Sequence, residues 1–135
     1  MQLTMITAGL LALLVVALGF RISLRRRQAR IPIGDGGDAI LQQRIRAHGN
    51  CVETVPLALI LLFLAEQAYG QPWYLIALAA LLVASRLLHP IGMGLPAPNL
   101  PRVAGILGTW GVTALLAILL LWRGLSLCGS CLVGA

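Results

Sequence analysis

The chain has 135 residues, of which 59% are hydrophobic and 10% charged, and its mean hydropathy is +0.93. A soluble domain has about 25% charged residues, so this composition excludes a water-soluble globule and indicates an integral membrane protein. The net charge of +6 comes entirely from arginine, and the arginines that directly follow an apolar run are typical of a cytoplasmic membrane flank, which argues against a nucleic-acid partner.

The first apolar segment, residues 3–20, spans roughly 27 Å as a helix at ~1.5 Å per residue, close to the hydrocarbon thickness of a bilayer. A cleaved secretory signal carries positive charge before its apolar run, whereas here five arginines follow it between residues 21 and 30. We therefore expect an uncleaved membrane anchor. Pro32 and the glycines of GDGG at residues 34–37 then predict a loop.

A second helix is predicted over residues 39–69, with Asp38 as its N-cap. After a turn containing Gly70 and Pro72, residues 73–89 are predicted to form the third crossing. Aromatic residues lie on both sides of this turn, as expected of an interfacial belt: Tyr69, Trp73 and Tyr74.

Residues 90–101 are rich in Pro and Gly and predict a loop, and residues 102–122 supply the fourth crossing. The predicted fold class is an all-α integral membrane protein, a single domain over residues 1–135 formed by a bundle of four transmembrane helices. Four crossings place both termini on one side of the membrane. The positive-inside rule then puts the arginine-rich loop side in the cytoplasm and the termini outside it.

Ionisable residues inside apolar crossings are costly, and they normally face the interior of a bundle. In the second helix, Arg46, Asn50 and Glu53 are spaced by four and then three residues, which puts them on one helix face. Arg86 and His89 lie in the last turns of the third helix, at a similar predicted depth. These five residues are candidates for one polar site near the cytoplasm.

Arg102 begins the fourth helix, where the positive end of the helix dipole favours an anion or a thiolate. Together with the five residues above, it predicts a hydrophilic pocket that opens toward the cytoplasm. The alternative is that Glu53 and Arg86 only neutralise each other as a structural pair. Glu66 lies thirteen residues from Glu53, which rotates it off that face, and it is predicted to be interfacial or structural.

The stretch RIRAHGNCVETVP, residues 44–56, resembles the signature of the MAPEG family, the membrane-associated proteins in eicosanoid and glutathione metabolism. GDGG, the LAE of residues 64–66, the SRLLHPIG of residues 85–92 and Arg102 also resemble bacterial members. The resemblance covers most of the chain. It implies a four-helix protomer of a homotrimer, in the inner membrane of a bacterium, with glutathione bound between neighbouring subunits.

By matched positions, the resemblance implies that Arg46, Asn50 and Glu53 hold glutathione, the expected co-substrate, and their depth adds Arg86 and His89 to this binding site. Arg102 resembles the arginine that hydrogen-bonds the glutathione sulfur. A nearby cation lowers the pKa of a free thiol from about 8.5 and so favours the nucleophilic thiolate.

The expected activity is a membrane-bound glutathione transferase, or a glutathione-dependent peroxidase. Its lipophilic small-molecule substrate would be dissolved in membrane lipid.

Departures from the family pattern keep other functions open. Thr54 and His89 stand where the better-known mammalian members carry tyrosines, and His48 replaces a glutamine. One alternative is therefore a non-catalytic membrane protein of the MAPEG fold. Another is a small four-helix transporter that exports cations by proton exchange, but such a protein places an essential carboxylate in its first crossing, and residues 3–20 contain none.

Two further patterns are interpreted as structural. Cys128 and Cys131 form a C-x-x-C in a short tail that lacks further metal ligands, so we expect an accidental or disulfide-bonded pair and no metal site. Cys51 is interpreted as a small packing residue. Small residues recur every three positions in the fourth helix and favour close packing against another helix: Gly105, Gly108, Gly111 and Ala114.

Overall fold

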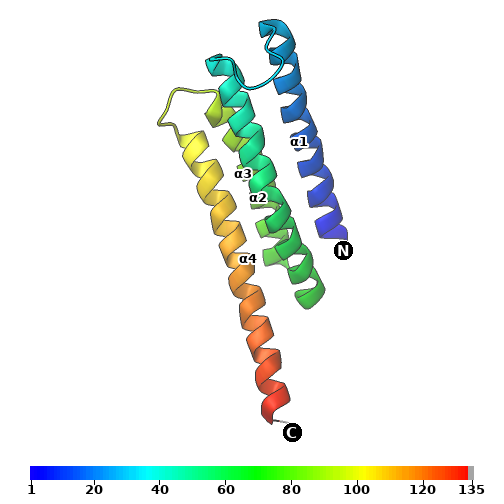
Figure 1. Ribbon diagram of the computed structural model, residues 1–135. Helices are drawn as coiled ribbons and strands as arrows, with labels where there is room; N and C mark the ends of the chain where they lie inside the picture. The colour runs from blue at the N-terminus through cyan, green and yellow to red at the C-terminus, as the bar shows by residue number, and fades with distance from the viewer. Residues whose placement is uncertain (134–135) are drawn as a thin grey trace.

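The computed structural model describes the backbone of residues 1–133 and the side chains of residues 1–128. Its helices are α1 (Gln2–Ala29), α2 (Ala39–Tyr69), α3 (Trp73–Met93) and α4 (Leu100–Val133). All four are long and apolar enough to cross a membrane. They run alternately up and down, so that the α1–α2 and α3–α4 loops lie at one end, called the loop end below (Figure 1). The predicted four-helix membrane bundle is confirmed.

The structure confirms the predicted bounds of α2, whereas the other three helices are longer than predicted. α1 continues nine residues beyond Phe20, because the end of an apolar segment does not end a helix and arginine is a good helix former. The predicted loop over residues 90–101 is wrong at its beginning, since α3 includes Pro90 and ends at Met93. Proline is tolerated in transmembrane helices where neighbouring helices satisfy the freed backbone groups.

The loop end of α1 is tied to α2 by Asp38, which confirms the predicted N-cap. Its carboxylate accepts a hydrogen bond from the backbone N–H of Leu41 at 2.7 Å and forms an ion pair with Arg25 at 2.6 Å. The side-chain hydrogen bonds from Arg25 and the amide of Leu41 hold the pKa of Asp38 below its ordinary value. Asp38 is therefore ionised at neutral pH and joins two consecutive helices.

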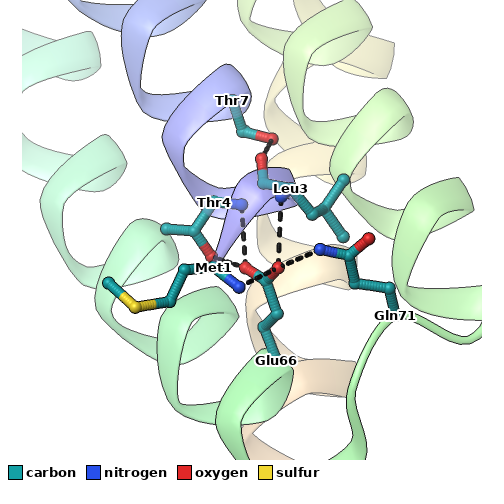
Figure 2. Close-up of polar contacts among 6 residues, drawn as sticks. All are labelled: Met1, Leu3, Thr4, Thr7, Glu66 and Gln71. Atoms are coloured by element: carbon teal, nitrogen blue, oxygen red, sulfur yellow. Dashed lines mark hydrogen bonds and ion pairs between the residues drawn. The ribbon is translucent and has the colours of Figure 1, made fainter.

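The opposite end of α1 is held by Glu66 of α2, which is 3% exposed. Its carboxylate accepts hydrogen bonds from the backbone N–H groups of Leu3 at 3.1 Å and Thr4 at 2.9 Å, and from the Thr4 hydroxyl (Figure 2). The Met1 amino group and the Gln71 amide complete the cluster, each at 2.7 Å. The first amides of a helix have no partner within the helix, so Glu66 caps α1. Its predicted structural role is confirmed.

α2 and α3 contact one another and both outer helices, whereas α1 and α4 do not pack together in the described part of the chain. The shared core consists of leucine, valine and small side chains, among them Leu11, Leu62, Leu75, Leu82 and Leu116. Large apolar side chains also cover the outer surface, including Leu13, which is 70% exposed, and Leu121, which is 66% exposed. This distribution fits a bundle surrounded by lipid, which solvates apolar side chains.

α3 and α4 cross closely where glycines stand on both helices. A Cβ atom built on Gly105 would lie 2.7 Å from the backbone nitrogen of His89, and one on Gly92 would collide with the backbone of Arg102. Of the predicted small-residue stripe, Gly105 and Gly108 therefore face α3 of the same chain. Gly111 has nothing within 4 Å of an added Cβ, so it lies outside this contact.

Of the cysteines, Cys51 is 1% exposed and packs in the core, as predicted. The predicted pairing of Cys128 with Cys131 involves a side chain outside the described residues.

We expect Gly105→Ala to destabilise the bundle by about 1–3 kcal/mol, because its methyl group would overlap backbone atoms of His89 that cannot move aside. Gly111→Ala is the matched control on the same helix, and it should be neutral or slightly stabilising because alanine is the better helix former. Thermal unfolding of both variants in detergent measures the difference. Equal midpoints for the two variants would contradict the close crossing.

Candidate functional site

A groove of ≈ 410 Å³ opens at the loop end beside α4. Its polar lining comes from three helices and the loop before α4: Asn50 of α2, His89 of α3, Asn99, and Arg102 of α4. Its other wall is apolar and is formed by one side of α4: Val103, Ile106 and Trp110. We call this the α4 groove. It combines hydrogen-bonding groups and a cation with a surface suited to an apolar molecule.

Arg102 lies in the first turn of α4 and is exposed, as the sequence predicts for a residue that begins the last helix. The side chain of Asn99 fixes this turn, because its Oδ1 accepts a hydrogen bond from the Arg102 backbone N–H at 3.0 Å. The Asn99 amide donates in turn to the carbonyl of Gly92 in α3 at 2.9 Å. Sequence reasoning missed Asn99, although an asparagine two residues before Pro101 is a recognisable helix-start signal.

Arg86 is 1% exposed and lies behind the α4 groove. Its Nη1 donates to Asn50 Oδ1 at 2.8 Å and Thr54 Oγ1 at 3.0 Å, and its Nη2 donates to the Gly105 carbonyl at 2.9 Å. One guanidinium on α3 thereby binds both α2 and α4. Glu53 is exposed and makes no ion pair with Arg86, so the alternative of a neutralising Glu53–Arg86 pair is wrong.

His89 is 5% exposed and lies one helical turn beyond Arg86, with its backbone against Gly105. Its Nδ1 atom is buried and has no hydrogen-bond partner, although the side chain lines the α4 groove. A buried polar atom without a partner is rare in native structures, so a ligand or a water molecule that reached this nitrogen would supply a missing hydrogen bond. The Thr54 hydroxyl, by contrast, is occupied, because it accepts from Arg86 and donates to the Asn50 carbonyl at 2.8 Å.

The structure brings three of the six predicted site residues into the α4 groove: Asn50, His89 and Arg102. Arg86 supports them from behind through its bond to Asn50. Arg46 and Glu53 are exposed and do not line this groove, so the predicted single pocket holding all six residues does not form within one chain. The spacing correctly places them on one face of α2, but that face is turned outward and only Asn50, at its edge, reaches the groove.

The outward face of α2 continues along the helix as a stripe with alternating spacings of four and three residues: Arg46, Asn50, Glu53, Leu57, Ile60 and Leu64. Its apolar members are 54%, 56% and 46% exposed, in chain order. Such spacing is the pattern by which helices pack along a shared seam. The stripe is polar only at the loop end, where it meets the α4 groove.

Comparison with known proteins extends this description. The model of the MAPEG family matches residues 4–122. Inner membrane protein YecN of Escherichia coli strain K12 is 35% identical over 115 residues, which cover 85% of this chain and 87% of that protein. The protein of the same name from Escherichia coli O6:H1 strain CFT073 has the same identity and coverage.

We expect Arg86→Met to destabilise the bundle by at least about 2 kcal/mol, because it removes three hydrogen bonds from a charged donor and leaves the Asn50 and Gly105 oxygens with fewer partners. Arg27→Met, at an exposed arginine of the same loop end, should change the unfolding midpoint little. Thermal unfolding in detergent compares the two. If both variants unfold like the wild type, Arg86 does not hold the three helices together.

Proposed function

The chain belongs to the MAPEG family as an integral membrane protein, and from this premise we propose that it binds glutathione or a related thiol in the α4 groove and conjugates it to lipophilic electrophiles. One observation carries the proposal: Asn50, His89 and Arg102 meet in a groove whose other wall is apolar. Such a groove suits a reaction between a polar co-substrate and a membrane-dissolved one. The membrane concentrates the apolar partner, and the aqueous phase supplies the charged one.

Arg102 is the residue to which we assign the thiol. Its guanidinium is exposed in the groove, and the first turn of α4 adds the positive end of the helix dipole. Both lower the pKa of a bound thiol and increase the fraction present as thiolate. The thiolate sulfur then forms a bond to an electrophilic carbon, and the leaving group departs with the electron pair of the bond that breaks. Val103 and Trp110 would contact the apolar part of the electrophile.

We propose a homotrimer as the active form: the α2 stripe supports association of several copies, and the number of subunits is what the family resemblance implies. Glu53 is exposed on a membrane-spanning helix, where an ionised side chain in contact with lipid costs roughly 2.5–3.5 kcal/mol at the helix centre, and Arg46 is exposed on the same face nearer the loop end. A second copy packed along Leu57 and Ile60 would shield them and bring them beside the groove of a neighbour. The proposed thiol site is therefore completed between subunits, in a bacterial inner membrane with the loop end in the cytoplasm.

A non-catalytic membrane protein of the same fold is the second candidate. It is favoured by Thr54, which stands where glutathione-using relatives carry a tyrosine, because its hydroxyl already binds Arg86 and the Asn50 carbonyl. A hydroxyl engaged in this way does not reach a ligand. Intact trimers that neither bind nor turn over glutathione would support this candidate.

We expect Arg102→Ala to lower kcat/KM for conjugation of glutathione to an aryl halide by at least about tenfold at neutral pH, since it removes the charge that stabilises the thiolate. The loss should shrink as the pH rises above the ordinary thiol pKa of about 8.5, because the thiolate then forms without assistance. Arg102→Lys keeps the charge and should restore part of the activity.

Activity and the ultraviolet absorbance of bound thiolate are measured in parallel, with Arg27→Ala as the control. An Arg102→Ala variant as active as the wild type would remove Arg102 from the mechanism. A wild type in lipid that neither binds nor turns over glutathione would remove the proposed function.

We expect Leu57→Trp to weaken the trimer, because a bulky ring does not fit a packed helix seam. Leu13→Trp is the matched control: Leu13 is 70% exposed on α1, where lipid accommodates the larger side chain. Native mass spectrometry from mild detergent gives the distribution of oligomers for both. A wild type that is not trimeric, or equal distributions for the two variants, would contradict assembly along the α2 stripe.

A further inference from the structure

A second groove of ≈ 260 Å³ lies at the loop end among α1, α2 and α3. Its polar lining consists of Arg21 of α1 with Gln43 and Arg44 of α2, and its apolar lining includes Leu18, Ile40 and Met93. We call it the α1–α2 groove. It shares no lining residue with the α4 groove, and the proposed thiol site uses neither Arg21 nor Arg44, although Arg44 is the first residue of the stretch that resembles the family signature.

The two arginines of this groove are held together without a neutralising anion. Arg44 Nη1 donates to the Arg21 carbonyl at 2.8 Å, which fixes its guanidinium across the α1–α2 contact. The carboxylates at this end of the described chain are used elsewhere, since Asp38 pairs with Arg25 and Asp35 accepts from the Gly37 amide. No acidic side chain lines the groove.

Unneutralised positive charge in a concave site attracts anions, and arginine matches the geometry of phosphate oxygens through paired N–H donors. The amide of Gln43 adds a neutral donor that can serve the same anion.

The depth of the groove identifies the source of the anion. Arg21 directly follows the apolar segment of residues 3–20, and Leu18, less than one turn earlier, is 4% exposed. The groove therefore spans the boundary between the hydrocarbon layer and the charged end of the bundle. This is the level of the phosphate groups of a bilayer, where basic side chains between transmembrane helices bind anionic headgroups.

We propose that the α1–α2 groove binds the headgroup of an acidic phospholipid. Arg21 and Arg44 donate to the phosphate oxygens, and Gln43 donates to the remaining polar atoms of the headgroup. The acyl chains leave the groove past Leu18 and Met93 and continue along the apolar surface of the bundle. The lipid would link α1 to α2 and α3 at the loop end, where α1 has few buried side chains.

The test measures lipid binding to delipidated wild-type protein in mild detergent by native mass spectrometry. Dioleoyl phosphatidylglycerol is compared with dioleoyl phosphatidylcholine, and inorganic phosphate is added as a competitor in a separate titration. We expect saturable binding of one phosphatidylglycerol per chain, with weaker binding of phosphatidylcholine. Inorganic phosphate should compete poorly, because it lacks acyl chains.

Arg21→Gln should weaken phosphatidylglycerol binding about fivefold, the effect of one arginine near an anionic lipid surface. Among the described residues, the Arg21 side chain has no hydrogen-bond partner, so this variant should fold, and its unfolding midpoint in detergent checks this. Arg27→Gln is the matched control: it removes the same charge at the same end, but Arg27 lies outside the groove. Arg44→Gln is the second variant and should also weaken binding.

Several outcomes would overturn the assignment. Equal affinity for the two lipids would remove the need for an anionic headgroup, and equal loss in Arg21→Gln and Arg27→Gln would indicate diffuse charge instead of a site. Phosphate competing as strongly as the lipid would identify a free-anion site. Absence of lipid binding, including absence because a neighbouring subunit covers the groove, would also exclude the proposal.

Discussion

The arrangement of the bundle depends on one buried guanidinium. Arg86 of α3 reaches Asn50 and Thr54 of α2 and the backbone of α4 at Gly105, so three helices share one charged donor. A charge buried in an apolar bundle is costly unless hydrogen bonds compensate, and three acceptors compensate at Nη1 and Nη2, whereas Nε has no partner among the described residues. The bond to the Gly105 carbonyl also requires the close α3–α4 crossing that only glycine allows. The α4 groove lies beside the place where the Arg86 hydrogen bonds and the close α3–α4 crossing meet.

The outer helix α1 illustrates a different constraint. Lipid is as apolar as leucine, so hydrophobic burial contributes little to the association of helices inside a membrane. α1 has only three buried residues, Thr7, Leu11 and Leu18. Carboxylates of the neighbouring segment attach it at both ends: Glu66 caps its first turn, and Asp38 pairs with Arg25 near its last. These polar contacts set the position of α1 on α2 more firmly than its sparse core contacts do.

The sequence predicts those features of the fold that depend on interactions between residues close together in the chain. The four crossings, both ends of α2 and the Asp38 cap follow from hydropathy, glycine and proline content and capping chemistry. The start of the predicted loop at residue 90 failed because the effect of a proline depends on the packing around it, and Pro90 is buried against neighbouring helices. Asn99 is of a residue type favoured at helix starts, so its role could have been predicted from the sequence.

The candidate site was only partly predictable for a related reason. Periodicity tells which residues share a helix face, but not which neighbour that face meets. Arg46, Asn50 and Glu53 do share a face, yet α2 meets α3 through the side that carries Cys51 and Val55, so Arg86 finds Asn50 and Thr54 instead of Glu53. The contact of Arg86 with Asn50 and Thr54 is a tertiary one. The spacing of residues within α2 or within α3 does not predict it.

The outward position of Arg46 and Glu53 is itself informative about assembly. In a soluble protein, charged side chains on an outer surface need no explanation, but these lie on a helix whose neighbouring exposed residues are Leu57, Ile60 and Val52. Lipid suits the apolar residues on that face, whereas an ionised Glu53 in contact with lipid would be costly, and Arg46 lies on the same face nearer the loop end. A second protein surface would suit both ends of the stripe. In the proposed assembly, a second copy would bring together the residues that the signature groups and the single chain separates, and the loop end of each protomer would supply one half of the proposed thiol site.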